Sequence, residues 1–373
     1  MGDVEVKRED VGKACVIKLY YKGEHVSGLW VHRLLVHFGE GTVLRMGGIG
    51  GVETKEGYRM RGFARRVLEE SNRFMEEDGM DVASLFGIRD FYQRWGYAPA
   101  LPEYKIYLKV DDLSGARLGR ELVPYSDEHR RKVVEIYESN NVSRACSVVR
   151  SPEVWEGFSK GTDYGTRPVP VVLSDRHGRT CGYLAFDDSE DRTAVSEVGY
   201  SDFEVFESLA AAIYLRAKER GHEEAQVAIP PDHPFAVFLR RFGCRAVTTF
   251  NRSGGGMMRI VSLGTTLSKL APELERRLAG SDMAGWEGRF RVRTDIGSLE
   301  VEVSGGKVSV ARDRGTREEL RLPQSKLTQL IVGYRTVDDL ASDEDVSVTP
   351  SLLPLLGRLF PPLNPYIWWS DRF

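Results

Sequence analysis

The sequence predicts an α+β protein made of three consecutive blocks. Its 373 residues are too many for one ordinary hydrophobic core, and this length indicates two or three domains. Residues 1–110 and 111–262 share one succession of elements, namely a hairpin, a strand, a long helix, a strand, a short helix and a strand. We interpret this as an internal duplication of the architecture at low sequence identity. Residues 263–373 differ, because three alternating strands lie between helices.

The first block is rich in strands and contains one strong helix. The expected elements are two strands within 15–39, strands near 42–45 and at 46–54, a helix at 62–78, a strand at 82–87, a short helix at 91–95 and a strand at 104–110. Lys22-Gly23 provides the turn of the first hairpin. The helix has one apolar face and ends at Asp78-Gly79. This face comprises Phe63, Ala64, Val67, Leu68, Phe74 and Met75.

The second and third blocks follow from the same rules. In the second we expect a helix at 129–139, a hairpin within 169–188, a strand at 195–200, a helix at 203–221, a strand at 225–230, a short helix at 235–243 and a strand at 244–250. In the third we expect a helix at 270–278, three strands within 288–313 and helices near 324–334 and 350–359. His177-Gly178, Ile296-Gly297 and Gly305-Gly306 provide the hairpin turns. The last residues, 361–373, are rich in proline and tryptophan.

Composition excludes several classes of function. The net charge of −3 gives no basic surplus for nucleic acid or anionic lipid, and no run of about 20 apolar residues could span a bilayer. The N-terminal residues lack the apolar stretch of a signal peptide. Four dispersed cysteines predict neither disulfides nor zinc, which favours a reducing cytoplasm. The seven histidines show no metal-ligand spacing, so we expect no metal.

The start of the helix at residue 62 is the most informative feature. The first turn of a helix has unpaired N–H groups and a partial positive charge, which together can bind a pyrophosphate. Gly62 has no Cβ that would keep a phosphate away from the backbone. Arg59, Arg61 and Arg65 add positive charge. A plain alternative is an arginine-rich helix start on a solvated face.

Two motifs resemble those of GNAT acetyltransferases. Residues 59–64, Arg-Met-Arg-Gly-Phe-Ala, resemble the R/Q-x-x-G-x-G/A signature of the acetyl-CoA site. Residues 91–97, Phe-Tyr-Gln-Arg-Trp-Gly-Tyr, resemble the F-Y-x-x-x-G-F/Y segment in which the tyrosine protonates the departing CoA thiolate. A phenol near pKa 10 is protonated at neutral pH, so Tyr92 suits a general acid. Its alternative role is to pack in the core.

The stretch 46–104, which contains both motifs, is similar to the first lobe of the enhanced-intracellular-survival (Eis) family, and the architecture of the second and third blocks extends this resemblance over nearly the whole chain. This resemblance implies tandem GNAT lobes at 1–110 and 111–262, the first shortened at its N-terminal side and the second degenerate. It also implies a domain at 263–373 that resembles sterol carrier proteins and presents the C-terminus. The implied catalytic groups are Tyr92 as acid and the carboxylate of Phe373 as base. The implied acetyl-CoA contacts are Val52, Thr54, Arg59, Met60, Gly62 and Phe63.

The resemblance also implies a reaction and partners. A primary amine would attack the thioester directly, without an acyl-enzyme, and the acceptor would be an aminoglycoside, a polyamine, an arylalkylamine or a lysine side chain. We expect no nucleic acid and no membrane as partner, and a homo-oligomer, a hexamer. A non-catalytic acyl-CoA-binding or scaffold protein is the alternative, and lipid carriage by the third block has only fold analogy behind it.

Three departures from the family pattern bear on activity. GNAT lobes usually open with a strand and two helices that form much of the acceptor pocket, and the sequence predicts that this opening is absent. The acceptor site would then be wider, be completed by another subunit, or be absent. Glu56 places a negative charge near the expected phosphates, which would weaken CoA binding. Asp202 and Glu204 occupy the corresponding junction of the second block, so we expect that block to be structural.

Overall fold

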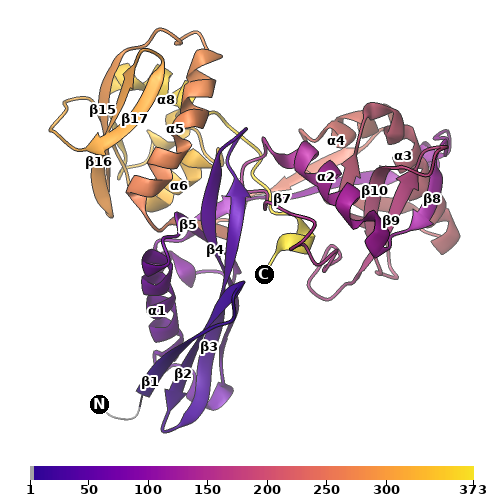
Figure 1. Ribbon diagram of the computed structural model, residues 1–373, viewed down its shortest axis with the longest axis horizontal. Helices are drawn as coiled ribbons and strands as arrows, with labels where there is room; N and C mark the ends of the chain where they lie inside the picture. The colour runs from indigo at the N-terminus through magenta and orange to yellow at the C-terminus, as the bar shows by residue number, and fades with distance from the viewer. Residues whose placement is uncertain (1–3) are drawn as a thin grey trace.

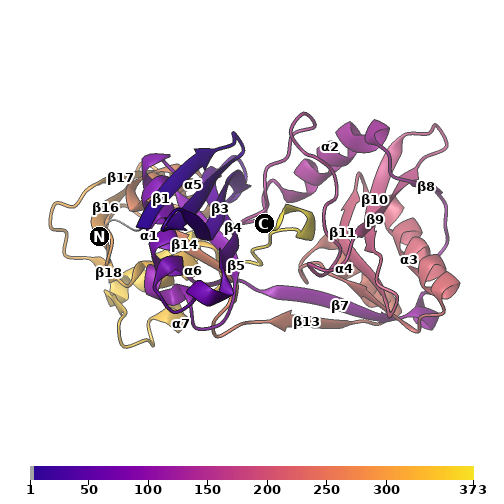
Figure 2. The ribbon, with the colours of Figure 1, turned by 90° about the horizontal axis from the view of Figure 1, so that it is seen from below.

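The computed structural model describes residues 4–373 and divides into three lobes (Figure 1). Two seven-stranded sheets and one five-stranded sheet form these lobes. The C-terminal residues lie between the first and second lobes in both views (Figures 1 and 2). The predicted α+β class is confirmed.

The first sheet has the strand order β1-β2-β3-β4-β5-β14-β6. Its strands are β1 (Val4–Asp10), β2 (Ala14–Tyr21), β3 (Glu24–His37), β4 (Val43–Thr54), β5 (Val82–Gly87), β6 (Ala98–Leu101) and β14 (Gly255–Ile260). Lys22 and Gly23 form the predicted turn with φ of 51° and 82°, because a two-residue hairpin needs positive φ at both positions. The segments predicted as separate strands at 42–45 and 46–54 are one strand, since β4 pairs with β3 along its whole length.

Helix α1 (Phe63–Glu77) covers one face of this sheet. Its buried residues confirm the predicted apolar face, apart from Ala64, which is half-buried. Asp78 caps the C-terminal end and Gly79 follows with φ 71°, as the sequence predicts. The helix packs close to β4, because a Cβ on Gly47 would lie 2.3 Å from the sulfur of Met75. A glycine at this position therefore sets the distance between helix and sheet.

The second sheet repeats the first. Its strands are β7 (Glu103–Lys109), β8 (Glu121–Pro124), β9 (Pro168–Ser174), β10 (Thr180–Asp187), β11 (Thr193–Tyr200), β12 (Glu224–Val227) and β13 (Arg245–Thr249). The helices of this lobe are α2 (Arg130–Asn141), α3 (Phe206–Arg220) and α4 (Pro234–Leu239). Starting from β8, the order β8-β9-β10-β11-β12-β7-β13 matches the first sheet strand by strand. The duplication that the element order predicts is thus visible in the sheet topology.

The two lobes exchange one strand each. β7 leaves the first block and pairs with β12 and β13 in the second sheet. β14 returns from the second block and pairs with β5 and β6 in the first sheet. Figure 2 shows β7 and β13 running together between the lobes. Strand pairing therefore crosses the chain divisions expected at residues 110 and 262.

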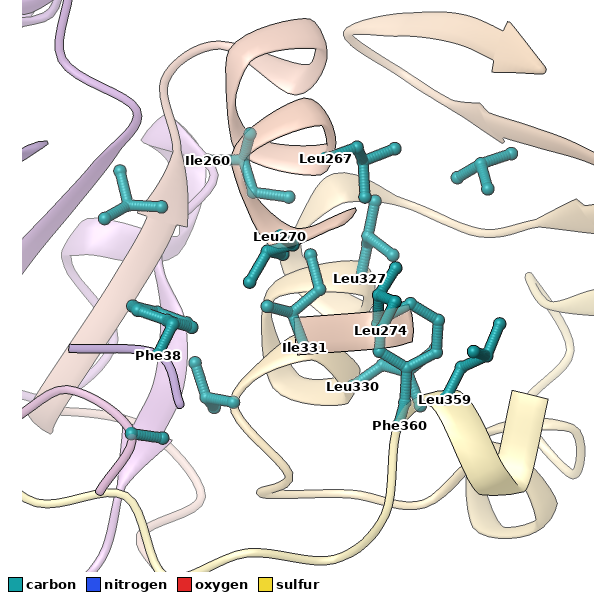
Figure 3. Close-up of a cluster of buried hydrophobic side chains, with 14 of the residues drawn as sticks. Phe38, Ile260, Leu267, Leu270, Leu274, Leu327, Leu330, Ile331, Leu359 and Phe360 are labelled. Atoms are coloured by element: carbon teal, nitrogen blue, oxygen red, sulfur yellow. The ribbon is translucent and has the colours of Figure 1, made fainter. Parts of the chain in front are cut away.

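The third lobe combines a small sheet with helices. Its elements are α5 (Leu263–Ala279), β15 (Gly288–Thr294), β16 (Gly297–Ser304), β17 (Lys307–Arg312), β18 (Glu319–Arg321), α6 (Gln324–Ile331), α7 (Val337–Leu340), β19 (Ser347–Val348) and α8 (Leu353–Leu359). Apolar side chains of α5, α6 and α8 pack together with Ile260 of β14 and with Phe38, which directly follows β3 (Figure 3). The third lobe therefore shares one hydrophobic core with the first.

Several short elements escape sequence prediction. The first strand of the chain, β1, is among them, so the expected absence of the whole strand-helix-helix opening is wrong in part. β1 leads through Val11–Lys13 directly into β2, and no helix lies between these two described strands. β1 is missed because its sequence, VEVKRED, is mostly charged and lies on the edge of the sheet. β14 is missed because it begins with two glycines.

Membrane insertion through a helix has no support in the structure. Over residues 4–373, none of the helices combines the length and the apolar character needed to cross a bilayer.

Candidate active site

The pairing of β4 with β5 stops halfway along both strands. The two run parallel and pair from Met46–Val82 to Ile49–Leu85. Beyond Ile49, β4 pairs only with β3. Gly51 forms a bulge there with φ 59°, because three residues of β4 span the distance of two on β3. The end of β4 thus presents main-chain groups with no strand beside them, and we refer to the gap beyond Ile49 and Leu85 as the β4–β5 split.

Val52 and Thr54 lie on this unpaired end of β4. The Thr54 hydroxyl is 2.8 Å from the Ser27 hydroxyl, which ties its side chain to β3. Val52 is half-buried and packs on the core between sheet and helix. Their side chains are therefore engaged within the lobe, and their main-chain groups are what an extended ligand would pair with.

The loop before α1 forms a concave set of free N–H groups. Met60 and Gly62 both have left-handed backbone, with φ of 62° and 77°. Within residues 4–373, the N–H groups of residues 60–65 donate no hydrogen bond. The hydrogen bonds of the helix itself begin with N–H groups further along the chain. No atom lies within 4 Å of the position of a Cβ on Gly62. Successive N–H groups at such a bend and a helix N-terminus bind anions.

The predicted pyrophosphate contacts are of two kinds, main-chain N–H groups and arginine side chains. Met60 is fully exposed, and the Phe63 ring is buried 5.5 Å from the ring of Tyr21, so both could offer only their N–H groups to a phosphate. Arg59 and Arg61 are exposed beside the loop, and Arg59 Nε donates to the main-chain oxygen of Thr54 at 3.4 Å. The Arg61 guanidinium lies 5.4 Å from the centre of the Tyr58 ring. Glu56, in the turn before them, is exposed, so solvent screens its charge.

Replacing Gly62 with alanine is expected to weaken coenzyme A binding roughly tenfold, because left-handed backbone costs an L-residue about 1–2 kcal/mol and the new Cβ enters the phosphate position. Calorimetric titration with coenzyme A measures this change. Gly57→Ala is the matched control, since Gly57 is also exposed, has no atom within 4 Å of its Cβ position and lacks positive φ. Equal affinities for the two variants would contradict the assigned phosphate position.

Tyr92 lies at the end of β5, on the face that α1 covers. It begins a short 3-10 helix, η2 (Tyr92–Trp95), which Gly96 ends with φ 83°. The ring packs against Gly87, where a Cβ would lie 2.4 Å from Tyr92 Cε2. Burial raises the pKa of Tyr92 above its ordinary value of 10, so its hydroxyl remains protonated at neutral pH.

Phe373 lies on the opposite face of the same strands. A Cβ on Gly48 would be 2.8 Å from its ring, and a Cβ on Gly50 would be 3.0 Å from its carboxyl carbon. The ring also contacts Phe86, with 5.8 Å between centroids. Only glycine at these two positions of β4 leaves room for the end of the chain. The structure therefore brings Tyr92 and Phe373 to the two faces of the sheet at the β4–β5 split.

A buried ion cluster in the second lobe holds the C-terminal segment. Arg150 donates to both oxygens of Glu197 at 2.7 and 2.8 Å and to Asp371 at 2.8 and 3.0 Å. Its guanidinium lies 3.7 Å from the centre of the Tyr137 ring. Burial opposes the charged form of Arg150, but the two carboxylates outweigh it and raise its pKa. We call Arg150, Glu197 and Asp371 the tail clamp.

Further contacts fix the residues on both sides of Asp371. Trp368 is completely buried and donates its indole N–H to Asn141 at 2.8 Å. Arg372 forms two hydrogen bonds with Glu103, at 2.8 and 3.0 Å. Lys160 donates to the main-chain oxygen of Arg372. The last residues are therefore held mainly by the second lobe while Phe373 contacts the first.

One segment of the second lobe borders the C-terminal residues. Residues 150–167 run beside the C-terminal segment, and Ser159 donates to the main-chain oxygen of Ser370 at 2.7 Å. Tyr164 packs on Trp369 with 5.8 Å between ring centroids. The three alternatives drawn from the sequence were a wider acceptor site, one completed by another subunit, or none, and none of them includes this contribution from residues 150–167 of the same chain.

The corresponding helix start of the second lobe is not an anion site. Asp202 caps it and accepts the N–H of Glu204 at 2.9 Å, so a carboxylate already occupies the position of an anion. This agrees with a structural role for the second lobe.

Sequence reasoning missed the residues that hold the C-terminal segment, namely Glu103, Arg150, Lys160 and Glu197. A signal for the C-terminal contact exists in the alternating glycines Gly48 and Gly50, since glycine in a strand marks close approach of another group. Asp371 and Arg372 in an aromatic segment also suggest buried ionic partners. Neither signal identifies which residues those partners are.

Comparison with known proteins agrees with this architecture. Residues 3–100 match the family model of the acetyltransferase (GNAT) domain, and residues 283–368 match that of the sterol carrier protein domain. A search of curated proteins found no match.

Three solved structures share the fold over almost the whole chain. A probable N-acyltransferase of unknown function from Enterococcus faecalis has a TM-score of 0.78 at 16% identity and covers 99% of both chains. A GCN5-related N-acetyltransferase from Anabaena variabilis has a TM-score of 0.75 at 17% identity, covering 96% of this chain and 89% of that one. Eis1 from Mycobacterium abscessus has a TM-score of 0.67 at 16% identity, covering 98% and 92%. The predicted resemblance in domain content and fold is confirmed.

Proposed function

We propose that this chain, whose first lobe is an acetyltransferase (GNAT) domain, transfers an acetyl group from acetyl-CoA to a primary amine. The observation that carries this proposal is the β4–β5 split with Tyr92 on one face and the Phe373 carboxyl group on the other. A thioester lying in the split would have a proton donor on its sulfur side and a base on its amine side.

The reaction would proceed by direct attack. The Phe373 carboxylate takes a proton from the substrate ammonium, and the free amine attacks the thioester carbonyl. The C–N bond forms, the C–S bond breaks and the thiolate accepts the proton of the Tyr92 hydroxyl, while the second proton lost by the nitrogen restores that hydroxyl. Cys15 and Cys146 are buried, and no cysteine among residues 4–373 is hydrogen-bonded to a histidine. A cysteine nucleophile therefore has no support.

The surroundings of Phe373 suit a cationic acceptor. The Phe373 carboxylate lies beside Phe86 and the glycines of β4, and its negative charge attracts an ammonium group. Trp30 lies beside the split and is 43% exposed, so its ring is available to a ligand. An aromatic ring next to a carboxylate attracts ammonium groups. Aminoglycosides, polyamines, arylalkylamines and lysine side chains all meet this requirement.

The proposed function is tested by thiol release from acetyl-CoA with a panel of these amines. Turnover with at least one of them, together with a mass increase of one acetyl group on the amine, is the expected result. Coenzyme A that stabilises the protein thermally while no amine is acetylated would instead support an acyl-CoA-binding or scaffold protein. The absence of helices between β1 and β2 is the observation that favours this second candidate.

The Tyr92→Phe variant is expected to lower kcat about tenfold, less than the usual general-acid effect of about 10²–10⁴-fold, because a thiolate with a pKa near 8.5 leaves with little assistance. Since burial raises the pKa of Tyr92, its hydroxyl should remain protonated up to at least pH 10 in the wild type. Tyr97→Phe is the matched control, because the buried Tyr97 ring lies 6.3 Å from that of Tyr92 and its hydroxyl has no hydrogen-bond partner within residues 4–373. An unchanged kcat in Tyr92→Phe would show that Tyr92 only packs.

A further inference from the structure

His32 lies beside the carboxyl group of Phe373. It is a half-buried residue of β3, and its ring is 6.0 Å from the Phe373 ring and stacks on Trp30 at 6.2 Å. The position of a Cβ on Gly50 is 3.5 Å from His32 Nε2 and 3.0 Å from the Phe373 carboxyl carbon. The two groups thus meet above one residue of β4, within reach of a single bridging water.

No protein group competes for this imidazole. Within residues 4–373, His32 forms no side-chain hydrogen bond, in contrast to His37, which pairs with Glu138 at 3.0 Å. The strands on either side place Ala14 and Gly48 opposite it, and neither has a polar side chain. A ring nitrogen of His32 is therefore free for a mobile proton.

The charged groups that face His32 come from two other segments. Lys160 approaches from the loop of the second lobe, and the Phe373 carboxylate comes from the end of the chain. Partial burial, and then the positive charge of Lys160, lower the pKa of His32 below its ordinary value of 6.5. The imidazole is consequently neutral near pH 7, and the carboxylate beside it would stabilise the imidazolium once a proton arrives.

The proposed reaction needs an outlet for one proton. An ammonium nitrogen loses two protons when it becomes an amide, whereas the departing thiolate takes up one. The remaining proton must reach solvent in every turnover. A carboxylate alone holds it weakly, and a group that titrates near neutrality is a better intermediate carrier.

We propose that His32 Nε2 accepts the proton that the Phe373 carboxylate takes from the substrate ammonium and releases it to solvent. This inference rests on the proposed acetyltransferase function. The carboxylic acid O–H bond breaks as the N–H bond of the imidazolium forms, so the carboxylate is regenerated before the next turnover. No oxidant or other reactant takes part in this step.

The proposal is tested with His32→Gln and His32→Ala in the full-length chain. Glutamine keeps a polar side chain that cannot carry the proton, and kcat is expected to fall roughly tenfold. In the wild type, kcat/KM should fall with decreasing pH on the acid side of about pH 6.5. This fall should be absent from His32→Gln. Added imidazole should restore turnover to His32→Ala in proportion to its neutral form. Affinity for coenzyme A should be unchanged.

His177→Gln is the control, because His177 lies exposed in the hairpin turn of the second lobe. Its activity and pH profile should match the wild type. Suppose that the wild type acetylates an amine. If His32→Gln then keeps the acid limb of the wild type, or if imidazole does not restore turnover to His32→Ala, the role of His32 is contradicted while the acetyltransferase function stands. If the wild type acetylates no amine, the acetyltransferase function falls and the role of His32 falls with it.

Discussion

Extending the chain by one glycine after Phe373 is expected to lower kcat with the best amine by about 10²–10⁴-fold, the range of a lost general base. The glycine converts the Phe373 carboxylate into a neutral amide and moves the charge by about 3.5 Å. The Phe373 ring and carboxyl group pack closely on Gly48 and Gly50. The end of the chain therefore cannot shift to bring the new carboxylate to the old position. Steady-state kinetics across the amine panel measure the loss.

Affinity for coenzyme A provides the internal control for this extension. The N–H groups of residues 60–65 lie in the loop before α1 and in its first turn, so titration should give the wild-type Kd. Phe373→Leu is the companion variant, because it keeps the terminal carboxylate and changes only the ring. It should retain more activity than the extended chain. Wild-type turnover in the extended chain would remove the Phe373 carboxylate from the mechanism.

Replacing Arg150 with methionine should destabilise the protein by about 3–5 kcal/mol, because the buried carboxylates of Glu197 and Asp371 lose their cation. The same change should release the C-terminal segment and abolish most turnover. Denaturant unfolding measures the first effect. The rate at which a carboxypeptidase removes Phe373 from the folded protein measures the second.

Two further variants make this test specific. Arg179→Met removes an exposed arginine that pairs with Asp175 in the same lobe, and its cost should stay below about 1 kcal/mol. Asp371→Asn weakens the tail clamp from the side of the C-terminal segment. It replaces Arg150→Met in the carboxypeptidase test if that variant does not fold. It should accelerate carboxypeptidase release while the second lobe remains intact. Wild-type release rates in both clamp variants would show that the other contacts of the segment suffice.

The elements that the sequence predicts well are those determined by neighbouring residues. Lys22-Gly23 adopts the hairpin turn, α1 buries the expected face, and β5 has the expected bounds, because turn chemistry and apolar periodicity act over a few residues. β14 fails this test, since its pairing with β5 and β6 depends on segments far away in the chain. The strand exchange between the lobes is invisible to sequence patterns for the same reason.

The same distinction between local features and contacts of distant segments applies to the candidate site. The free N–H groups before α1 follow from a glycine and a helix start, both local features, and the sequence by itself therefore determined where an anion could bind. The meeting of Phe373 with Gly48, Gly50 and His32 was decided only by the tertiary structure. It depends on the tail clamp, in which Arg150 and Asp371 are 221 residues apart. Such a contact forms only after strand exchange and lobe packing have placed the two segments side by side, and no local propensity encodes that placement.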